Sequence, residues 1–171
     1  MTKIFSDDPL VPYKTTKVGA LQTRAEIDGL LARWGIKDSH WHWDPEHNAV
    51  FLQFKLTEVI DGVSVTSVIK VEAPPIWDKK TRNKVEEINW RVSLRVLWWF
   101  LKSHLEAAYL RQSDKTTAFL PYIANADGTK TIRDVIIPRL TKQGIPELDI
   151  LPDTHERDQE HVIEAEAVRH E

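Results

Sequence analysis

The alternation of apolar and polar residues predicts a helix, three strands and a second, longer helix. Apolar residues recur every three or four positions in residues 20–34 and again in residues 81–112, which is the repeat of a helix with a covered face. Residues 40–44, 49–59 and 63–72 instead alternate between apolar and polar, as strands with one covered face do. The predicted order is therefore helix, strand, strand, strand, helix.

Short connections join the predicted strands, so we expect an antiparallel meander. Asp61-Gly62 suits a two-residue hairpin turn, because both central positions of the preferred turn have positive φ. Pro74-Pro75 ends the third strand, since proline cannot donate to a sheet ladder. A further helical segment is expected from Ile132 to about Lys142. The predicted fold class is α+β with a C-terminal helical segment.

The long helix is expected to carry two apolar faces. When each residue is turned by about 100°, one face is formed by Trp90, Leu94, Leu97, Trp98, Leu101, Leu105 and Ala108. The roughly opposite face is formed by Val85, Ile88, Val92, Val96, Trp99 and Phe100. One face would cover the sheet, and the other would contact either the C-terminal segment or a second copy. We therefore expect a homo-oligomer formed through the long helix, and we expect Trp77 to be the most exposed tryptophan.

Length and charge suggest one domain with two appendages. A chain of 171 residues suits a single core, which we expect in residues 17–150 after an N-terminal arm, residues 1–16. Residues 151–171 hold seven acids and two arginines, which gives this tail a net charge of −5, whereas the whole chain has a net charge of −3. We expect a disordered acidic tail, or a tail that competes for a basic surface.

Composition excludes several classes of protein. The absence of cysteine rules out disulfides, cysteine-based zinc sites and thiol catalysis. The longest apolar run, residues 96–101, is far shorter than the about 20 residues of a membrane-spanning helix. Residues 1–9 carry charges where a signal peptide is apolar. We expect a cytoplasmic protein without a membrane partner. Because no phosphate-binding loop or dinucleotide fingerprint is present, we expect no cofactor.

Four cations of the long helix form a row, which we call the basic stripe: Lys84, Arg91, Arg95 and Lys102. Their spacings of seven, four and seven place them in one narrow sector of a helix. A row of cations suits the phosphate backbone of a nucleic acid. The alternative is the solvated edge of a helix whose other faces are covered.

The outward face of the predicted sheet offers a second nucleic-acid surface. Phe51, Lys55 and Lys70 fall on the polar side of the alternation. Proteins that bind single strands stack bases on exposed aromatic rings beside cations. The alternative is an ordinary polar face turned to solvent.

Two patterns suggest metal chemistry. His40, His42 and Asp44 share one face of a strand, as metal ligands two positions apart do, although structural histidine pairs are commoner. Asp44, Gln53 and Lys55 resemble the nuclease pattern in which acids on two strands hold magnesium beside a lysine. Glutamine replaces the second acid, which weakens metal binding.

Two resemblances rest on these residues. The run from Trp90-Arg91 to Leu105-Glu106, followed by residues 119–123 and Asp127-Gly128-Thr129, resembles uncharacterised small proteins encoded by phages and viral metagenomes. That group implies no established activity. The element order is similar to the core of phage single-strand annealing proteins and to the double-stranded-RNA-binding domain. This similarity implies a viral nucleic-acid-binding protein, and it rests on element order alone.

The leading hypothesis is a non-enzymatic, oligomeric nucleic-acid-binding protein that uses the basic stripe or the outer sheet face. The first alternative is a protein-interaction module, whose exposed apolar helix face docks a partner protein. The second alternative is a magnesium-dependent nuclease.

Overall fold

The structure, a computed structural model, describes residues 3–60, 62–79, 86–110, 114–125 and 127–143. The predicted acidic tail lies outside the described residues. The chain divides into two compact units, Met1–Ile136 and Ile137–Glu171. The elements are β1 (Ile4–Phe5), α1 (Ala20–Arg33), β2 (Ser39–Asp44), β3 (Ala49–Ile60), β4 (Val63–Glu72), β5 (Ile76–Lys79), β6 (Glu86–Ile88), α2 (Trp90–Tyr109), α3 (Lys115–Ala118), the 3-10 helix η1 (Leu120–Tyr122) and α4 (Ile132–Gln143).

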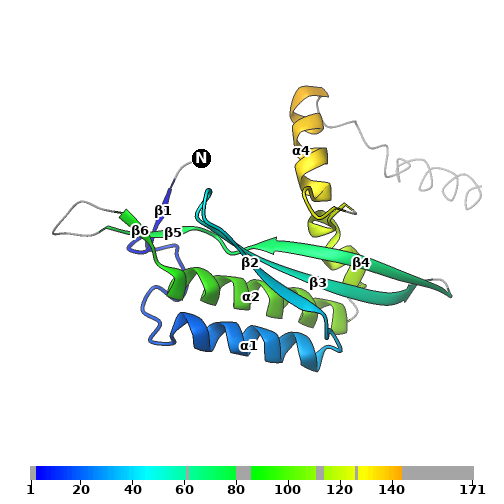
Figure 1. Cartoon of the computed structure of the whole chain (residues 1–171), viewed down its shortest axis with the longest axis horizontal. Coiled ribbons are helices and arrows are strands. Elements are labelled where there is room, and N and C mark those ends of the chain that lie inside the picture. Colours follow the sequence, from blue (N-terminus) through cyan, green and yellow to red (C-terminus); the bar gives the residue numbers. More distant parts are fainter. Residues whose placement is uncertain (1–2, 61, 80–85, 111–113, 126, 144–171) are drawn as a thin grey trace, which may run out of the picture. The chain divides into compact units, whose positions relative to one another are not determined.

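The predicted α+β class and the order helix, three-stranded antiparallel sheet, helix are confirmed. β3 is the central strand and pairs antiparallel with β2 and with β4. α1 and α2 lie side by side under one face of this sheet (Figure 1). The turn before β4 places Ile60 opposite Val63 and Gly62 at φ +80°, a conformation that glycine adopts without strain.

The alternation of the strands decides which face the helices cover. In β3, Leu52, Phe54 and Leu56 are buried, whereas Lys55 and Thr57 between and after them are exposed. Successive side chains of a strand point to opposite faces, so the odd-numbered residues of β3 lie on the outer face of the sheet. The inward and outward assignments made from the sequence are confirmed here.

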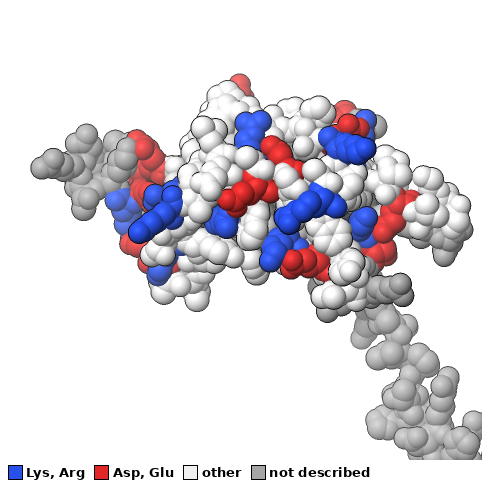
Figure 2. Space-filling view, turned by 90° about the horizontal axis from the view of Figure 1, so that it is seen from below, with Lys and Arg blue, Asp and Glu red and all other residues white. Residues whose placement is uncertain are grey.

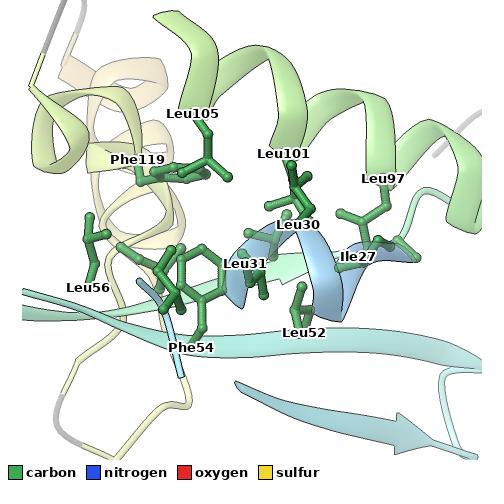
Figure 3. Packing of buried hydrophobic residues seen from close by; sticks show 14 of the residues in the cluster. Ile27, Leu30, Leu31, Leu52, Phe54, Leu56, Leu97, Leu101, Leu105 and Phe119 are labelled. Atoms are coloured by element: carbon green, nitrogen blue, oxygen red, sulfur yellow. The ribbon is translucent and has the colours of Figure 1, made fainter. Parts of the chain in front are cut away.

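The core lies between the sheet and the two helices (Figure 3). Its largest fully buried side chains include Phe54 of β3 and Phe119, which follows α3, and their rings meet edge to face at 5.7 Å. Apolar burial of this kind is the main favourable term in folding. The core is completed by Ile27, Leu30, Leu31, Leu52, Leu56, Ile69, Val71, Leu94, Leu97, Leu101 and Leu105.

The predicted extent of the long helix is wrong. Residues 86–88 form β6, which pairs antiparallel with β5, and helix α2 begins only at Trp90. Asn89 caps it, because the Asn89 side chain accepts a hydrogen bond from the Val92 N–H at 3.1 Å. α2 has 20 residues and ends at Tyr109 rather than near residue 112. Apolar periodicity did not distinguish strand β6 from another helical turn.

A smaller sheet joins the N-terminal residues to the start of α2. Residues 1–16, expected to be an arm, include β1, which pairs parallel with β5. Val11, Ile76 and Val92 form a second buried cluster beneath this sheet. The N-terminal segment is thus held to β5 by β1 and to α2 by Val11, while Leu10 is 88% exposed.

The second unit is described only in residues 137–143, the last part of α4. The helix continues through Pro138, and the Thr141 hydroxyl donates to the carbonyls of Ile137 and Pro138 at 3.1 Å each. In the described parts of both units, no helix is long and apolar enough to cross a membrane.

Candidate functional site

The basic stripe is interrupted by acids of the same chain. The Arg95 guanidinium forms an ion pair with Glu26 of α1 and lies 4.2 Å from the centre of the Trp98 ring. Lys102 forms an ion pair with Glu106 at 3.3 Å. Two of the four cations therefore have carboxylate partners.

The remaining two cations do not restore a continuous row. Lys84 lies outside the described residues, and Arg91 is exposed and forms no ion pair with another described residue. Figure 2 shows the side of the molecule on which α1 and α2 lie, where basic and acidic side chains alternate. A phosphate backbone would meet charges of both signs on this side.

The outer sheet face brings Lys70 beside Phe51, whereas Lys55 lies four positions further along β3. The Lys70 ammonium lies 4.6 Å from the centre of the Phe51 ring and donates to the Gly128 carbonyl at 3.0 Å. Lys55 remains 60% exposed, 4.0 Å from Asp38. Because Lys70 covers one side of the Phe51 ring, that ring is a poor platform for stacking a base.

The predicted metal residues do not form a cluster. His40 and His42 are exposed, while the Asp44 carboxylate forms a hydrogen bond with Nδ1 of His47 at 2.7 Å. This hydrogen bond lowers the pKa of Asp44 and raises the pKa of His47. Among the described residues, no three His, Asp or Glu side chains are placed to hold a metal ion.

The nuclease pattern is not assembled either. Asp44 lies opposite Ala49 at one end of the β2–β3 ladder, whereas Gln53 lies opposite His40. Four strand positions separate the two levels, or about 13 Å at about 3.3 Å per residue. Asp44 therefore does not converge with Gln53 and Lys55.

An apolar pocket opens beside α2, where β4 ends. Its volume is about 200 Å³. Two charged residues, Glu72 and Arg133, take part in the lining, and the other lining residues are Val71, Pro74, Val96, Leu97, Phe100 and Tyr122. The walls come from β4, α2, η1 and the first turn of α4, so four separate parts of the first unit build this site.

Aromatic contacts fix the wall formed by Phe100 and Tyr122. Their rings meet edge to face at 5.1 Å, and the His104 ring lies 4.0 Å from the Phe100 ring. His104 also donates from Nδ1 to the Phe100 carbonyl at 2.9 Å. Because each ring is held by a neighbour, the wall is preorganised rather than formed on binding.

Glu72 places a solvent-exposed side chain at the rim of this pocket. Its surroundings withdraw water from the carboxylate and so raise the pKa of Glu72, although Lys70 and Arg133 nearby act in the opposite direction. Glu72 makes no hydrogen bond or ion pair with another described residue. A donor brought by a binding partner would relieve this desolvation.

Trp99 extends the apolar surface beyond the pocket. It stands one helical turn after Val96 and is 50% exposed. Trp43 is 54% exposed, whereas Trp77 is only partly exposed and lies under the Lys3 ammonium at 4.5 Å. The prediction that Trp77 is the most exposed tryptophan is wrong.

Sequence reasoning found only part of this site. It placed Val96, Trp99 and Phe100 on a second face of the helix, but it did not connect them with Glu72 or Arg133. The aromatic and apolar residues of segment 119–123 were the available signal, because such residues are usually packed against a core. Comparisons with protein-family models, with curated proteins and with solved structures give no match for this chain.

Proposed function

We propose that this protein is a protein-interaction module, which docks a polypeptide partner by inserting one large apolar side chain of that partner into the pocket beside α2. The pocket is the observation that carries this proposal. Six of its eight lining residues are apolar, and Trp99, one helical turn after the lining residue Val96, is half-exposed.

The size of the pocket favours a single side chain over a small-molecule ligand. Small-molecule sites occupy about 300–1,000 Å³, and this pocket has about 200 Å³. A cavity of about 150 Å³ is enough to hold benzene. One phenylalanine, leucine or methionine side chain therefore fits, and the rest of the ligand would lie on the surface.

The surroundings resemble the centre of an interface. A few buried anchors surrounded by a rim supply most of the binding energy of protein complexes, and tryptophan is enriched among them. Trp99 is an exposed tryptophan that could serve as such an anchor, and the exposed Glu72 offers an acceptor for a basic side chain or a backbone N–H. We therefore expect the partner segment to carry a basic residue next to its apolar anchor.

Selection of peptides tests the proposal. A random peptide library would be selected on the wild-type protein and counter-selected on Val96→Phe, whose larger side chain fills the pocket. We expect enriched peptides to share one apolar residue beside a lysine or arginine. Their Kd, measured by fluorescence anisotropy, should rise at least about tenfold in Val96→Phe, which corresponds to about 1.4 kcal/mol.

The matched control is Val59→Phe, because Val59 is 69% exposed on β3 and does not line the pocket. This variant should bind the selected peptides as the wild type does. Peptides that bind both Val→Phe variants equally, or no enrichment at all, would contradict docking at the pocket.

Nucleic-acid binding is the second candidate function. It is supported by two cations that stay exposed, Arg91 on α2 and Lys55 on β3. Anisotropy of labelled single- and double-stranded oligonucleotides, at two salt concentrations with and without magnesium, tests it. Saturable binding that weakens steeply with salt and is lost in Arg91→Ala would favour this function, and cleavage only with magnesium would favour the nuclease.

A further inference from the structure

The outer edge of β2 is open among the described residues. β2 is the first strand of the sheet order β2-β3-β4 and pairs only with β3 there. The Lys55 N–H donates to the Asp38 carbonyl at 3.2 Å, so the backbone of Asp38 faces β3. Backbone groups of successive residues in an antiparallel strand point to opposite sides. Those of Ser39, Trp41 and Trp43 therefore point to the open edge.

The two edges of this sheet are treated differently. At β4, Ile123 forms a bridge with Ile69, and the Ala124 N–H donates to the Val68 carbonyl at 2.8 Å. β2 has six consecutive residues in regular register with β3 and contains no proline, lysine or bulge. Proteins usually protect exposed edge strands with such features. β2 lacks them and is suited to accept a further strand.

One flank of α1 lies on the same side of the molecule as this edge. The Trp41 indole N–H donates to the Asp28 carboxylate at 3.0 Å, and the Arg24 guanidinium lies 5.2 Å from the centre of the Trp41 ring. The opposite flank of α1 holds Glu26, which pairs with Arg95 of α2. Asp28 therefore marks the flank of α1 that borders β2 and is turned away from α2.

This flank of α1 is exposed, small and uncharged at three positions. Leu21, Ala25 and Ala32 lie within about 60° of Asp28 at about 100° per residue. All three are exposed, and Leu21 is 82% exposed. Small residues let two helices approach within about 8–10 Å. The charged residues Arg24 and Asp28 lie on the same flank, where both contact Trp41 of β2. The open strand edge and this flank therefore adjoin each other, and the flank combines apolar positions with charges of both signs.

We propose that a second copy of this chain occupies this side, so that β2 pairs antiparallel with β2 of the second copy and α1 packs on α1. The two three-stranded sheets become one continuous sheet. Leu21, Ala25 and Ala32 of the two copies meet beneath it. α2, through which the sequence predicted self-association, lies outside this interface.

The residues of β2 fit a two-fold axis at His42. Residues directly opposite each other in an antiparallel pair share a face. Pairing centred on His42 sets Trp41 opposite Trp43 of the second copy on the helix-covered face. It also sets His40 opposite Asp44 of the second copy on the outer face, where an imidazole N–H can donate to the carboxylate. Because the same strand and the same flank serve both copies, the interface is isologous, as two-fold symmetry requires.

A single cysteine tests the strand pairing, since the chain contains no cysteine of its own. In the proposed dimer, His42 lies opposite His42 of the second copy, at a position where the two residues do not hydrogen-bond to each other. The two Cα atoms of such a pair are about 4.5 Å apart. This distance is within the range that a disulfide can bridge. We expect His42→Cys to form a covalent dimer on oxidation. Thr57→Cys, which is exposed on β3 away from the edge, should stay monomeric on a non-reducing gel.

Sedimentation velocity of the full chain tests the helix contact. The wild type should sediment as a dimer, with twice the monomer mass of 19.8 kDa. Ala25→Glu places two like charges at the axis and should raise the dimer Kd at least about tenfold, whereas Ser64→Glu, exposed on β4, should not. The proposal is overturned by a monomeric wild type, by a dimer whose Kd is unchanged in Ala25→Glu, or by His42→Cys cross-linking no faster than Thr57→Cys.

Discussion

At the scale of single residues, charged groups are set by their immediate neighbours. The side chains of Asp44 and His47 form a hydrogen bond across the turn between β2 and β3. The Asp44 carboxylate also accepts hydrogen bonds from the backbone N–H groups of Glu46 and His47, at 3.0 and 3.2 Å. Glu72 is different, because its side chain is exposed and makes no hydrogen bond with another described residue, while desolvation raises its pKa. The first arrangement stabilises a turn, and the second leaves a carboxylate ready for a partner.

Asp44→Asn tests the first arrangement. The hydrogen bond from His47 raises the pKa of His47 above 6.5 and lowers the pKa of Asp44 below 3.8. The hydrogen bond of His47 thus contributes fully to stability below the pKa that His47 has in the unfolded chain. This contribution is lost as the pH rises through the pKa of His47 in the folded chain. The contribution of Asp44 to stability is complete above the pKa that Asp44 has in the unfolded chain. It is lost as the pH falls through the pKa of Asp44 in the folded chain. An NMR titration of Asp44→Asn should show the His47 pKa falling toward 6.5. Asp38→Asn should leave it unchanged, and an equal shift in both variants would contradict the pairing.

Glu72→Gln tests the second arrangement. Desolvation raises the pKa of Glu72 above 4.5, so the folded state holds this proton more tightly than the unfolded state. Stability contributed by protonated Glu72 is then lost as the pH rises through the unfolded and the folded pKa. We expect the Tm of Glu72→Gln to exceed that of the wild type at pH 7 and to match it at pH 3. Glu46→Gln, at a residue that does not line the pocket, should show no such difference, and a Tm gain that is independent of pH would contradict desolvation as the cause.

At the scale of elements, the alternation along β3 and β4 was readable from the sequence because each strand has one buried face. The bounds of β4 and the start of α1 agree with the predictions. The β6 strand was missed, because its existence depends on pairing with β5 rather than on its own three residues. Pairing between separate segments leaves no local period for sequence analysis to detect.

Leu101→Ala measures how much α2 contributes through its covered face. Leu101 is fully buried between α2, the sheet and α1, so the substitution should lower the free energy of unfolding by about 2–5 kcal/mol. Leu10→Ala makes the same change at a side chain that is 88% exposed and should stay within about 0.5 kcal/mol. Equal losses in chemical denaturation would contradict the assignment of the core.

Two glycine-to-alanine substitutions should change the free energy of unfolding in opposite directions. Gly128 has φ +69°, and an added Cβ would lie 2.9 Å from the Gln53 amide nitrogen, so Gly128→Ala should cost about 1 kcal/mol. Gly29 lies within helix α1 with nothing within 4 Å of an added Cβ, so Gly29→Ala should gain about 0.5–1 kcal/mol. Urea denaturation of both variants measures this. A stabilised Gly128→Ala would show that the turn at residues 127–130 does not need its positive φ.

At the scale of the whole first unit, the two sides of the sheet have different uses in our proposals. The β4 side carries the pocket, and the β2 side carries the open edge with the flank of α1. A dimer formed through β2 would leave both pockets free, so a partner with two docking segments would bind with a higher effective concentration. The pocket was beyond sequence analysis because it joins Glu72, Val96, Tyr122 and Arg133 across some sixty positions of the chain.

The most direct test of the pocket is an NMR titration of the ¹⁵N-labelled full chain with toluene, the analogue of a phenylalanine side chain. We predict saturable shifts at the backbone amides of Val71, Val96, Phe100 and Tyr122, with a Kd of about 1 mM, or about 4 kcal/mol. These shifts should disappear in Val96→Phe and persist in Val59→Phe. The absence of shifts at these amides, or equal shifts in both variants, would contradict an apolar docking site beside α2.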